Sequence, residues 1–384
     1  MSGLDQFSLF DLISLFYAFL GIRALWTLKQ NWRAFSDNEL TAFDRQLASQ
    51  IAFFVFIPIG VFFHELGHAA ATYQVGGTID WFGGGFHYAL FFGYVIPLGR
   101  FSFLQDWWIA LAGNLVSVVY GFIPLILLRF TNKTWVKYTL LAFARIQLGW
   151  SLVGYPLLTF AGFEGDWNTI YFTNALLSVP LFIAHAGLGI ALWRLDRSVR
   201  VKRWEFGLYA GATEPLRQCD NAVAARPGSI EPLIARGNLF GSQGQVDLAL
   251  SDYRTALKLD PQNPRALFNI AQVRLIQKRY SEAEKILRGA LERAAVEGDP
   301  QLAARIHYGL ATALYQRGKP AEAVPEYDQA IARLPNVAQF YFSRGLARRG
   351  SHDEAGARSD FAHVVEFAVD DQELAQRARE MLSN

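Results

Sequence analysis

Charged residues are distributed very unevenly along this chain of 384 residues. Residues 1–195 carry 10 Lys and Arg and 10 Asp and Glu, whereas the remaining 189 residues carry 26 and 24. Nine of the ten Trp also lie in the first part. A charge-poor, aromatic-rich segment of this length predicts a membrane domain, and the charge-rich segment after it predicts a soluble domain. We therefore predict domains over residues 1–200 and 201–384.

The first domain contains about five stretches of roughly 20 mostly apolar residues, the length that crosses a bilayer. They lie near residues 8–27, 50–72, 104–129, 136–162 and 168–194. Residues 80–98 alternate β-branched and aromatic residues with glycine breaks, which predicts a β-hairpin. Backbone in lipid must satisfy its own hydrogen bonds, so this hairpin is expected on protein or at the interface. The predicted fold is all-α: a polytopic transmembrane helix bundle with a membrane-associated β-hairpin, followed by an α-solenoid.

Two groups of basic residues flank the predicted spans. The first group lies between the third and fourth spans and the second follows the fifth: Arg129, Lys133 and Lys137, then Arg194, Arg197, Arg200, Lys202 and Arg203. Loops rich in Lys and Arg stay on the cytoplasmic side. The pattern therefore predicts a multi-pass integral membrane protein with its second domain in the cytoplasm and its N-terminus outside.

The second predicted span ends in a sequence typical of metal binding, His64-Glu65-Leu66-Gly67-His68. Residues four apart share a helix face, so His64 and His68 can present two imidazoles to one ion. Glu65 can reach a metal-bound water as general base. Unpaired groups of this kind would cost several kcal/mol in an apolar span, which favours a metal site over a chance match. Imidazole ligands suit zinc, so Zn²⁺ is the expected cofactor.

A third ligand must come from elsewhere in the chain. Asp166, in a glycine-containing turn between the fourth and fifth spans, is the leading candidate because a carboxylate oxygen suits zinc. Glu164 in the same turn is its rival, and Asp80 and Asp106 are weaker candidates. Asp166 could instead cap the following helix, as aspartate commonly does.

Other polar residues in the apolar segments carry less information. Arg145, Gln147 and His185 could line a cavity or be paired structurally within the bundle. Asn114 follows Ala112-Gly113, where helices could approach closely. Asn114 is a candidate for binding substrate backbone, and helix packing is its alternative interpretation.

The sequence also excludes some partners and sites. Cys219 is the only cysteine, so neither an intrachain disulfide nor a thiolate zinc site can form. The formal net charge is only +2, and we expect no nucleic-acid partner.

The apolar domain resembles the site-2 protease family of intramembrane zinc metalloproteases over about residues 45–170. The resemblance rests on the His64–His68 motif at the end of an apolar helix, Gly76-Gly77 with the glycine-rich segment after it, an Ala-Gly helix start at 112–113, and a later aspartate. It implies that His64, His68 and Asp166 bind zinc and that Glu65 activates water. It further implies a hydrolase that cuts membrane-anchored substrates within the bilayer. Family members hold the metal nearer the cytoplasm, which would instead place the second domain outside.

The second domain repeats a pattern with a period of about 34 residues. The first copy runs Leu233, Gly237, Phe240, Ala249, Tyr253, Ala256 and Pro261, and further copies follow near residues 264–297, 304–337 and 338–368. The first copy occupies residues 230–263, and residues 371–383 read as a capping helix. Small residues let paired helices approach and the closing proline ends the second helix. This pattern resembles the tetratricopeptide repeat, which implies binding of a protein or peptide partner.

Two functions therefore compete at the level of sequence. The leading expectation is an intramembrane zinc endopeptidase acting on a membrane protein with a transmembrane helix, targeted by its repeats in a lipid bilayer. The alternative is a membrane-tethered scaffold or assembly factor with a structural or inactive metal site.

Overall fold

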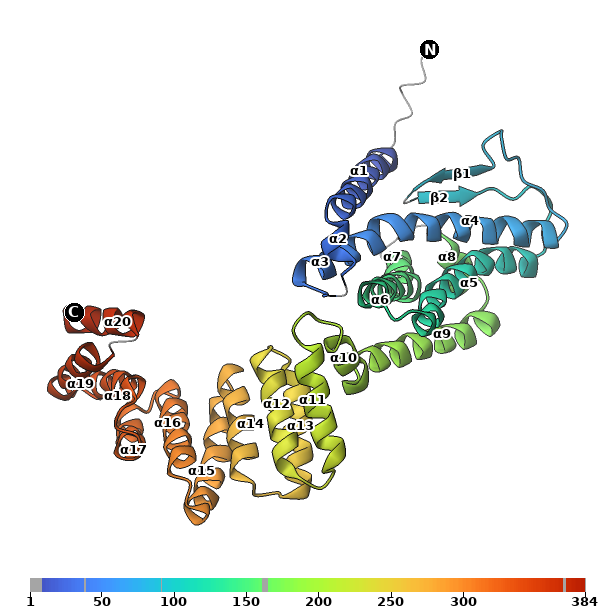
Figure 1. Ribbon diagram of the computed structural model, residues 1–384. Helices are drawn as coiled ribbons and strands as arrows, with labels where there is room; N and C mark the ends of the chain where they lie inside the picture. Colours follow the sequence, from blue (N-terminus) through green and yellow to red (C-terminus); the bar gives the residue numbers. More distant parts are fainter. Residues whose placement is uncertain (1–8, 38, 91, 161–164, 369–370, 384) are drawn as a thin grey trace. The chain divides into compact units, whose positions relative to one another are not determined.

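The computed structural model describes residues 9–37, 39–90, 92–160, 165–368 and 371–383. The chain divides into two compact units, Met1–Thr213 and Glu214–Asn384. Helices dominate both units (Figure 1), as the sequence predicts. We describe the units separately.

Unit 1 consists of helices and one small sheet. Its α-helices are α1 (Leu9–Gln30), α2 (Trp32–Phe35), α3 (Ala42–Ile51), α4 (Ile57–Gln74), α5 (Phe103–Leu127), α6 (Thr134–Gly149), α7 (Tyr155–Phe160), α8 (Asp166–Phe172), α9 (Ala175–Asp196) and α10 (Val199–Phe206). The π-helical segments Ala52–Phe56 and Trp150–Gly154 join α3 to α4 and α6 to α7 without a break. Thr41 begins α3 with a reciprocal capping box to Asp44, which satisfies backbone donors at the helix start.

The sheet of unit 1 has two antiparallel strands, β1 (Phe86–Ala89) and β2 (Phe92–Val95), with Phe86 opposite Val95. It lies along α4 (Figure 1), where the Tyr88 hydroxyl donates to the Pro58 carbonyl at 2.8 Å. The Ser14 hydroxyl of α1 also donates to the carbonyl of Ala89. The sheet is therefore fixed between two long helices.

Four stretches of the described chain are long and apolar enough to cross a membrane, judged by length and composition alone. They are Leu12–Gln30, Ala42–Gln74, Phe103–Phe130 and Ala175–Asp196. The stretch predicted at 168–194 is interrupted, because Asn174 caps a new helix by accepting a hydrogen bond from the Leu176 backbone. The structure does not by itself support the finer prediction of a membrane bundle with a membrane-associated hairpin. In the described part of the chain the strands form one small two-stranded sheet.

Unit 2 is a succession of antiparallel helix pairs. Its helices are α11 (Thr213–Ala225), α12 (Ile230–Ser242), α13 (Val246–Leu259), α14 (Pro264–Ile276), α15 (Tyr280–Glu297), α16 (Pro300–Gln316), α17 (Pro320–Arg333), α18 (Ala338–Gly350), α19 (Glu354–Phe367) and α20 (Gln372–Ser383). Within a pair the small residues are fully buried, as Ala249 and Ala256 on α13 show, and the large Tyr253 fills the space between helices. This is the packing of an α-solenoid.

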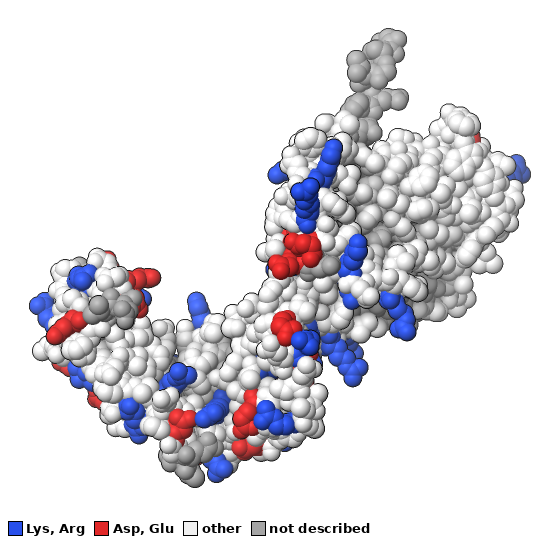
Figure 2. Space-filling model, in the orientation of Figure 1, with Lys and Arg blue, Asp and Glu red and all other residues white. Residues whose placement is uncertain are grey.

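The two units differ in surface chemistry. Figure 2 shows that the visible face of unit 1 is mostly uncharged, whereas Lys, Arg, Asp and Glu are scattered over unit 2. Many large apolar side chains of unit 1 are exposed, among them Phe16, Ile22 and Ile183 at 63%, 68% and 65%. Exposed apolar area on this scale marks a surface that contacts something other than water.

Candidate metal centre

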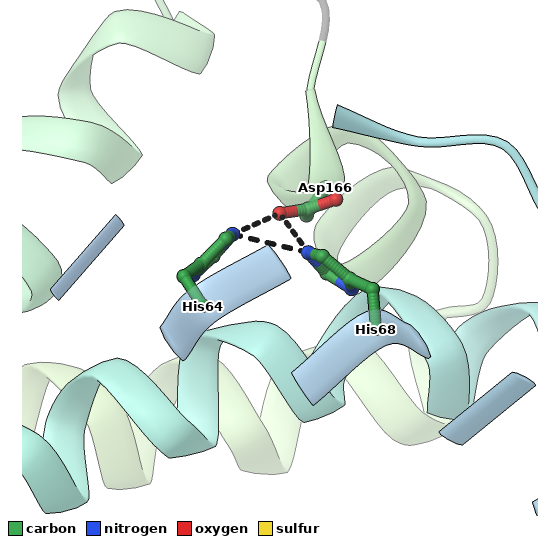
Figure 3. Close-up of side chains that lie close together, drawn as sticks. All are labelled: His64, His68 and Asp166. Carbon is green, nitrogen blue, oxygen red and sulfur yellow. Dashed lines mark hydrogen bonds and ion pairs between the residues drawn. The ribbon is translucent and has the colours of Figure 1, made fainter. Parts of the chain in front are cut away.

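Two helices bring the predicted metal ligands together. His64 and His68 lie one turn apart on α4, and both are buried. Asp166 is the first residue of α8, and its N-cap is Gly165, so the Asp166 side chain does not cap the helix. It points instead at the two imidazoles (Figure 3).

The three donor atoms converge on one point. The Nε2 atoms of His64 and His68 lie 3.0 Å apart, and Oδ2 of Asp166 lies 3.0 Å from the first and 3.1 Å from the second. Ligand atoms of a tetrahedral zinc ion with bonds of about 2.0–2.2 Å are roughly 3.3–3.6 Å apart. The triangle is therefore within a few tenths of an ångström of a zinc site.

The other ring nitrogens are held by a second set of contacts. Nδ1 of His68 lies 2.7 Å from the Ile109 carbonyl oxygen. A carbonyl can only accept, so Nδ1 carries the proton and Nε2 of the neutral ring presents its lone pair to the centre. Nδ1 of His64 lies 2.9 Å from the Ser117 hydroxyl. Outward contacts of this kind orient imidazoles that bind metals.

Asp166 is supported by two further donors. The Tyr155 hydroxyl donates to Oδ2 at 3.2 Å and the Asn114 amide at 3.3 Å. Burial raises the pKa of the Asp166 carboxyl, but when no metal is bound a proton on the facing His68 ring outweighs burial and holds this pKa well below its usual range. The carboxylate is therefore ionised, the state that a metal requires.

The rival third ligands lie elsewhere. The Asp80 carboxylate accepts from the backbone N–H groups of Phe82 and Gly83, and Asp106 lies in the first turn of α5. Glu164 lies outside the described residues. Among the residues that the structure describes, the cluster of possible ligands at this site is His64, His68 and Asp166.

Asn114 is buried within α5, where its amide also donates to the Ala110 carbonyl at 3.0 Å. Its Oδ1 atom has no hydrogen-bond partner in the described structure. The substrate-binding role predicted for Asn114 is not tested by this geometry. The contact that the structure gives it is with the carboxylate of Asp166.

Glu65 is buried beneath the sheet. A Cβ atom placed on Gly93 of β2 would lie 2.6 Å from Cγ of Glu65 and 3.0 Å from its carboxyl carbon. Only glycine leaves room for the Glu65 side chain at this point of the strand. Glu65 is thus held beside the ligands by α4 and covered by β2.

Gly113 is a positioning residue that the sequence did not reveal. We expected a helix start at 112–113, but α5 begins at Phe103 and Gly113 lies inside it. A Cβ at this position would approach Nε2 of His68 to 2.3 Å. Gly113 therefore admits the His68 ring between α4 and α5.

The remaining polar residues of the apolar segments have structural partners away from the cluster. Arg145 pairs with Asp196 and Glu205, each at 2.7 Å. Gln147 donates to Ser151 at 3.1 Å, and Nδ1 of His185 hydrogen-bonds the Tyr171 hydroxyl. The structural interpretation fits all three residues, and Arg145 also lines a cavity, as its alternative interpretation predicts.

The donor set fits a transition metal such as zinc. Two neutral imidazoles and one carboxylate are three of the donors that zinc takes, and three protein ligands leave one position for water or another small ligand. Without an ion, two lone pairs and an anion would face one another at 3.0–3.1 Å, an arrangement that a cation or a proton must stabilise.

Ser117→Ala is expected to weaken zinc binding by about tenfold, because His64 loses the contact that orients its ring. Competition with a chromogenic chelator would measure the dissociation constant. Thr139→Ala is the matched control, since the buried Thr139 hydroxyl donates to the Trp135 carbonyl of its own helix. An unchanged affinity in Ser117→Ala would show that this contact does not orient the ligand.

Comparison with protein-family models identifies the repeats. Three tetratricopeptide-repeat models match residues 237–277, 263–336 and 308–368. Together they cover the helix pairs from α12 to α19. Such repeats point to a protein partner.

Curated relatives match over part of the chain. Cellulose synthase operon protein C of Xanthomonas axonopodis is 30% identical over 35% of this chain and 10% of its own length. The DnaJ homolog subfamily C member 7 homolog of Schizosaccharomyces pombe is 26% identical over 42% of this chain and 36% of its own. The chain therefore spans about a third or less of these two relatives.

Solved structures also match part of the chain. MamA of Desulfovibrio magneticus is 22% identical, with a TM-score of 0.36 over 49% of this chain and 97% of its own. Yeast Tom70 is 15% identical, with a TM-score of 0.38 over 73% of this chain and 55% of its own.

These findings correct the expected function. The prediction of an intramembrane zinc endopeptidase, and with it the assignment as a hydrolase, is wrong by this comparison, because the family models that match the chain are tetratricopeptide repeats and give no support to the site-2 protease family. The motif that suggested a protease identifies metal donors, and donors alone do not define a reaction. What the chain has in common with known proteins is its second unit: residues 237–368 are tetratricopeptide repeats.

Proposed function

We propose that this chain is a membrane-anchored interaction protein, in which unit 1 holds the repeats at a membrane and the repeats bind a protein partner. The match of residues 237–368 to tetratricopeptide repeats carries the proposal. Apolar stretches long enough to cross a bilayer support the anchoring role. The Lys and Arg that flank them favour a multi-pass protein with its repeats in the cytoplasm.

The surface that would receive the partner is built from the first helix of each pair. Helix α12 contacts α14, α14 contacts α16, and α16 contacts α18, so these helices form a continuous face. Polar side chains without charge follow one another along it. We call these four amides and one threonine the amide row: Asn238, Asn269, Gln272, Thr312 and Gln339.

One hydrogen bond between repeats and one within a repeat hold the first two residues of the amide row in place. The Asn269 amide donates to Oδ1 of Asn238 at 2.9 Å, and the Tyr253 hydroxyl donates to the same oxygen at 2.8 Å. Asn238 is exposed and Asn269 and Gln272 are half-buried, so their remaining donors and acceptors face solvent. Such groups can pair with the backbone of an extended peptide, which carries both donors and acceptors.

The metal centre has a supporting role in this proposal. We propose that Zn²⁺ bound by His64, His68 and Asp166 links α4 to the start of α8. The donor set and the outward contacts of both imidazoles support zinc. A metal that joins segments 98 residues or more apart in sequence stabilises the folded unit, because the unfolded chain does not present the site.

The triple variant Asn238→Ala, Asn269→Ala, Gln272→Ala tests the repeat surface. Proteins crosslinked to the full chain in its native membrane would be quantified by mass spectrometry. We expect at least one abundant partner to fall by about tenfold, since each lost hydrogen bond costs roughly 0.5–1.5 kcal/mol.

The control carries Gln329→Ala and Gln376→Ala, exposed amides on α17 and α20 outside the amide row. It should retain the same partners. If the triple variant and the control have identical crosslinked proteins, the amide row does not bind the partner and the proposal fails at this surface.

A further inference from the structure

A cavity in unit 1 lies apart from the metal centre, between the end of α5 and helices α6, α9 and α10. Its volume is about 760 Å³, within the range of ligand-binding pockets. Most of its lining is apolar: Leu125, Leu141, Leu148, Val153, Leu192 and Trp193. A cavity of this character favours an acyl chain or another apolar group.

The polar part of the lining is mainly cationic. Arg129, Lys137 and Arg145 line the cavity, together with the single acidic residue Asp196. Arg145 is neutralised, because it pairs with Asp196 and with Glu205. Arg129 and Lys137 make no side-chain hydrogen bond or ion pair within the described residues. Arg129 and Lys137 therefore add two positive charges to a mostly apolar cavity, and together with Arg145, Asp196 and Glu205 they give a net charge of +1.

The position of these charges fits the boundary of a membrane. Arg129 lies at the end of the apolar stretch Phe103–Phe130, and Lys137 lies in the first turn of α6. Trp193 and Trp204 also line the cavity and are 55% and 38% exposed. Tryptophan and basic residues at the end of apolar helices are typical of the level of lipid headgroups.

We propose that this cavity binds one anionic phospholipid, with its phosphate between Arg129 and Lys137 and an acyl chain along the apolar lining. The inference rests on the membrane anchoring proposed above. The charge complementarity selects a negatively charged headgroup, and basic pockets between membrane helices bind such headgroups on the cytoplasmic side. A zwitterionic lipid would fill the same volume without satisfying the two charges.

Native mass spectrometry of the full chain in detergent, with added phosphatidylglycerol or phosphatidylcholine, tests the proposal. We expect one phosphatidylglycerol to remain bound and phosphatidylcholine to bind at least about tenfold more weakly, since each basic residue favours an anionic headgroup. Arg129→Gln with Lys137→Gln should abolish this preference. Equal binding of both lipids to the natural chain would overturn the proposal. So would preferential binding of free oleate, added as a third ligand.

Two further variants separate a defined site from diffuse attraction. Lys133→Gln with Arg194→Gln removes the same number of charges from exposed positions that do not line the cavity, and should leave the preference within about twofold. Gly149→Phe fills the cavity from a position with no neighbouring atom within 4 Å, and should weaken lipid binding with all charges kept. If Lys133→Gln with Arg194→Gln lowers the lipid preference as strongly as Arg129→Gln with Lys137→Gln, the attraction is diffuse and the site does not exist.

Failure of this inference can be told from failure of the proposed anchoring. Membranes that contain the chain would be washed with alkaline carbonate before purification. A chain that stays with the membrane but shows no lipid preference refutes the lipid site alone. A chain released by the wash refutes the anchoring and the lipid site together.

Discussion

Arg236→Ala is expected to lower the free energy of unfolding of the first repeats by about 3–5 kcal/mol. The Arg236 side chain is 6% exposed and joins three helices. Its guanidinium donates to both oxygens of Asp252 at 2.7 Å and to Asp220 at 2.8 Å. Removing the arginine leaves the nearly buried Asp252 carboxylate unpaired, which costs more than the pair itself contributes.

The same ion pairs recur at the other end of the solenoid. Arg344 donates to both oxygens of Asp360 at 2.6 and 3.0 Å and to Asp328 at 2.6 Å. In both places the arginine lies 16 residues from each of its two aspartates. Arg344→Ala should destabilise the last repeats by less than Arg236→Ala destabilises the first, because Arg348 also donates to Asp360 at 3.0 Å and would keep this carboxylate paired.

Hydrogen exchange of the full chain would measure this effect helix by helix, because local opening reports local stability. The double variant Arg236→Leu, Asp252→Leu should recover most of the loss, since apolar residues can replace a buried ion pair at little cost. Glu214→Ala removes an exposed pair with Arg217 and should leave stability nearly unchanged. Equal effects of Arg236→Ala and Glu214→Ala would contradict the argument.

The repeats were predictable because their signal is redundant. Small residues such as Ala249 and Ala256 and a large one such as Tyr253 recur together, so no single substitution hides the period. The ion pairs of Arg236 were harder to find. In the two middle repeats the position of Arg236 is occupied by Ile270 and Leu310, so these pairs do not follow the period through every copy.

For the metal ligands, the sequence predicted the two histidines but left the third ligand open. Helix geometry alone places His64 beside His68, but sequence left Asp166, Glu164 and other carboxylates as alternatives for the third ligand. Chain folding over about a hundred residues decides which carboxylate reaches the imidazoles. Gly113 was missed because its importance lies in the absence of a side chain opposite His68.

The predicted reaction was wrong for a related reason. A short motif fixes donor atoms and their spacing, and similar donors serve structural, regulatory and hydrolytic sites on many folds. The repeats, which contain no metal motif, are what the chain shares with known proteins. The function is therefore better inferred from the extended repeat surface than from the five residues 64–68.

Zinc is expected to stabilise unit 1 by about 4 kcal/mol when its free concentration is a thousand times the dissociation constant. His68→Ala should remove this zinc-dependent gain, because only two protein ligands remain. Gly113→Val should remove it as well, although all three donors are kept, since a side chain there would overlap the His68 ring. Thermal unfolding of the full chain in detergent, with zinc and with a chelator, would measure both effects beside the metal content of the purified protein.

Gly149→Val is the matched control for Gly113→Val. It adds the same side chain to an apolar helix, at a position with no neighbouring atom within 4 Å. Both variants lose a helical glycine, so a difference between them isolates the contact with His68. We expect Gly149→Val to bind zinc like the natural chain and Gly113→Val to unfold at one temperature with or without zinc. If zinc does not change the unfolding temperature of the natural chain, His64, His68 and Asp166 do not bind this metal together. If Gly113→Val still binds zinc, α4 and α5 can separate without losing the site.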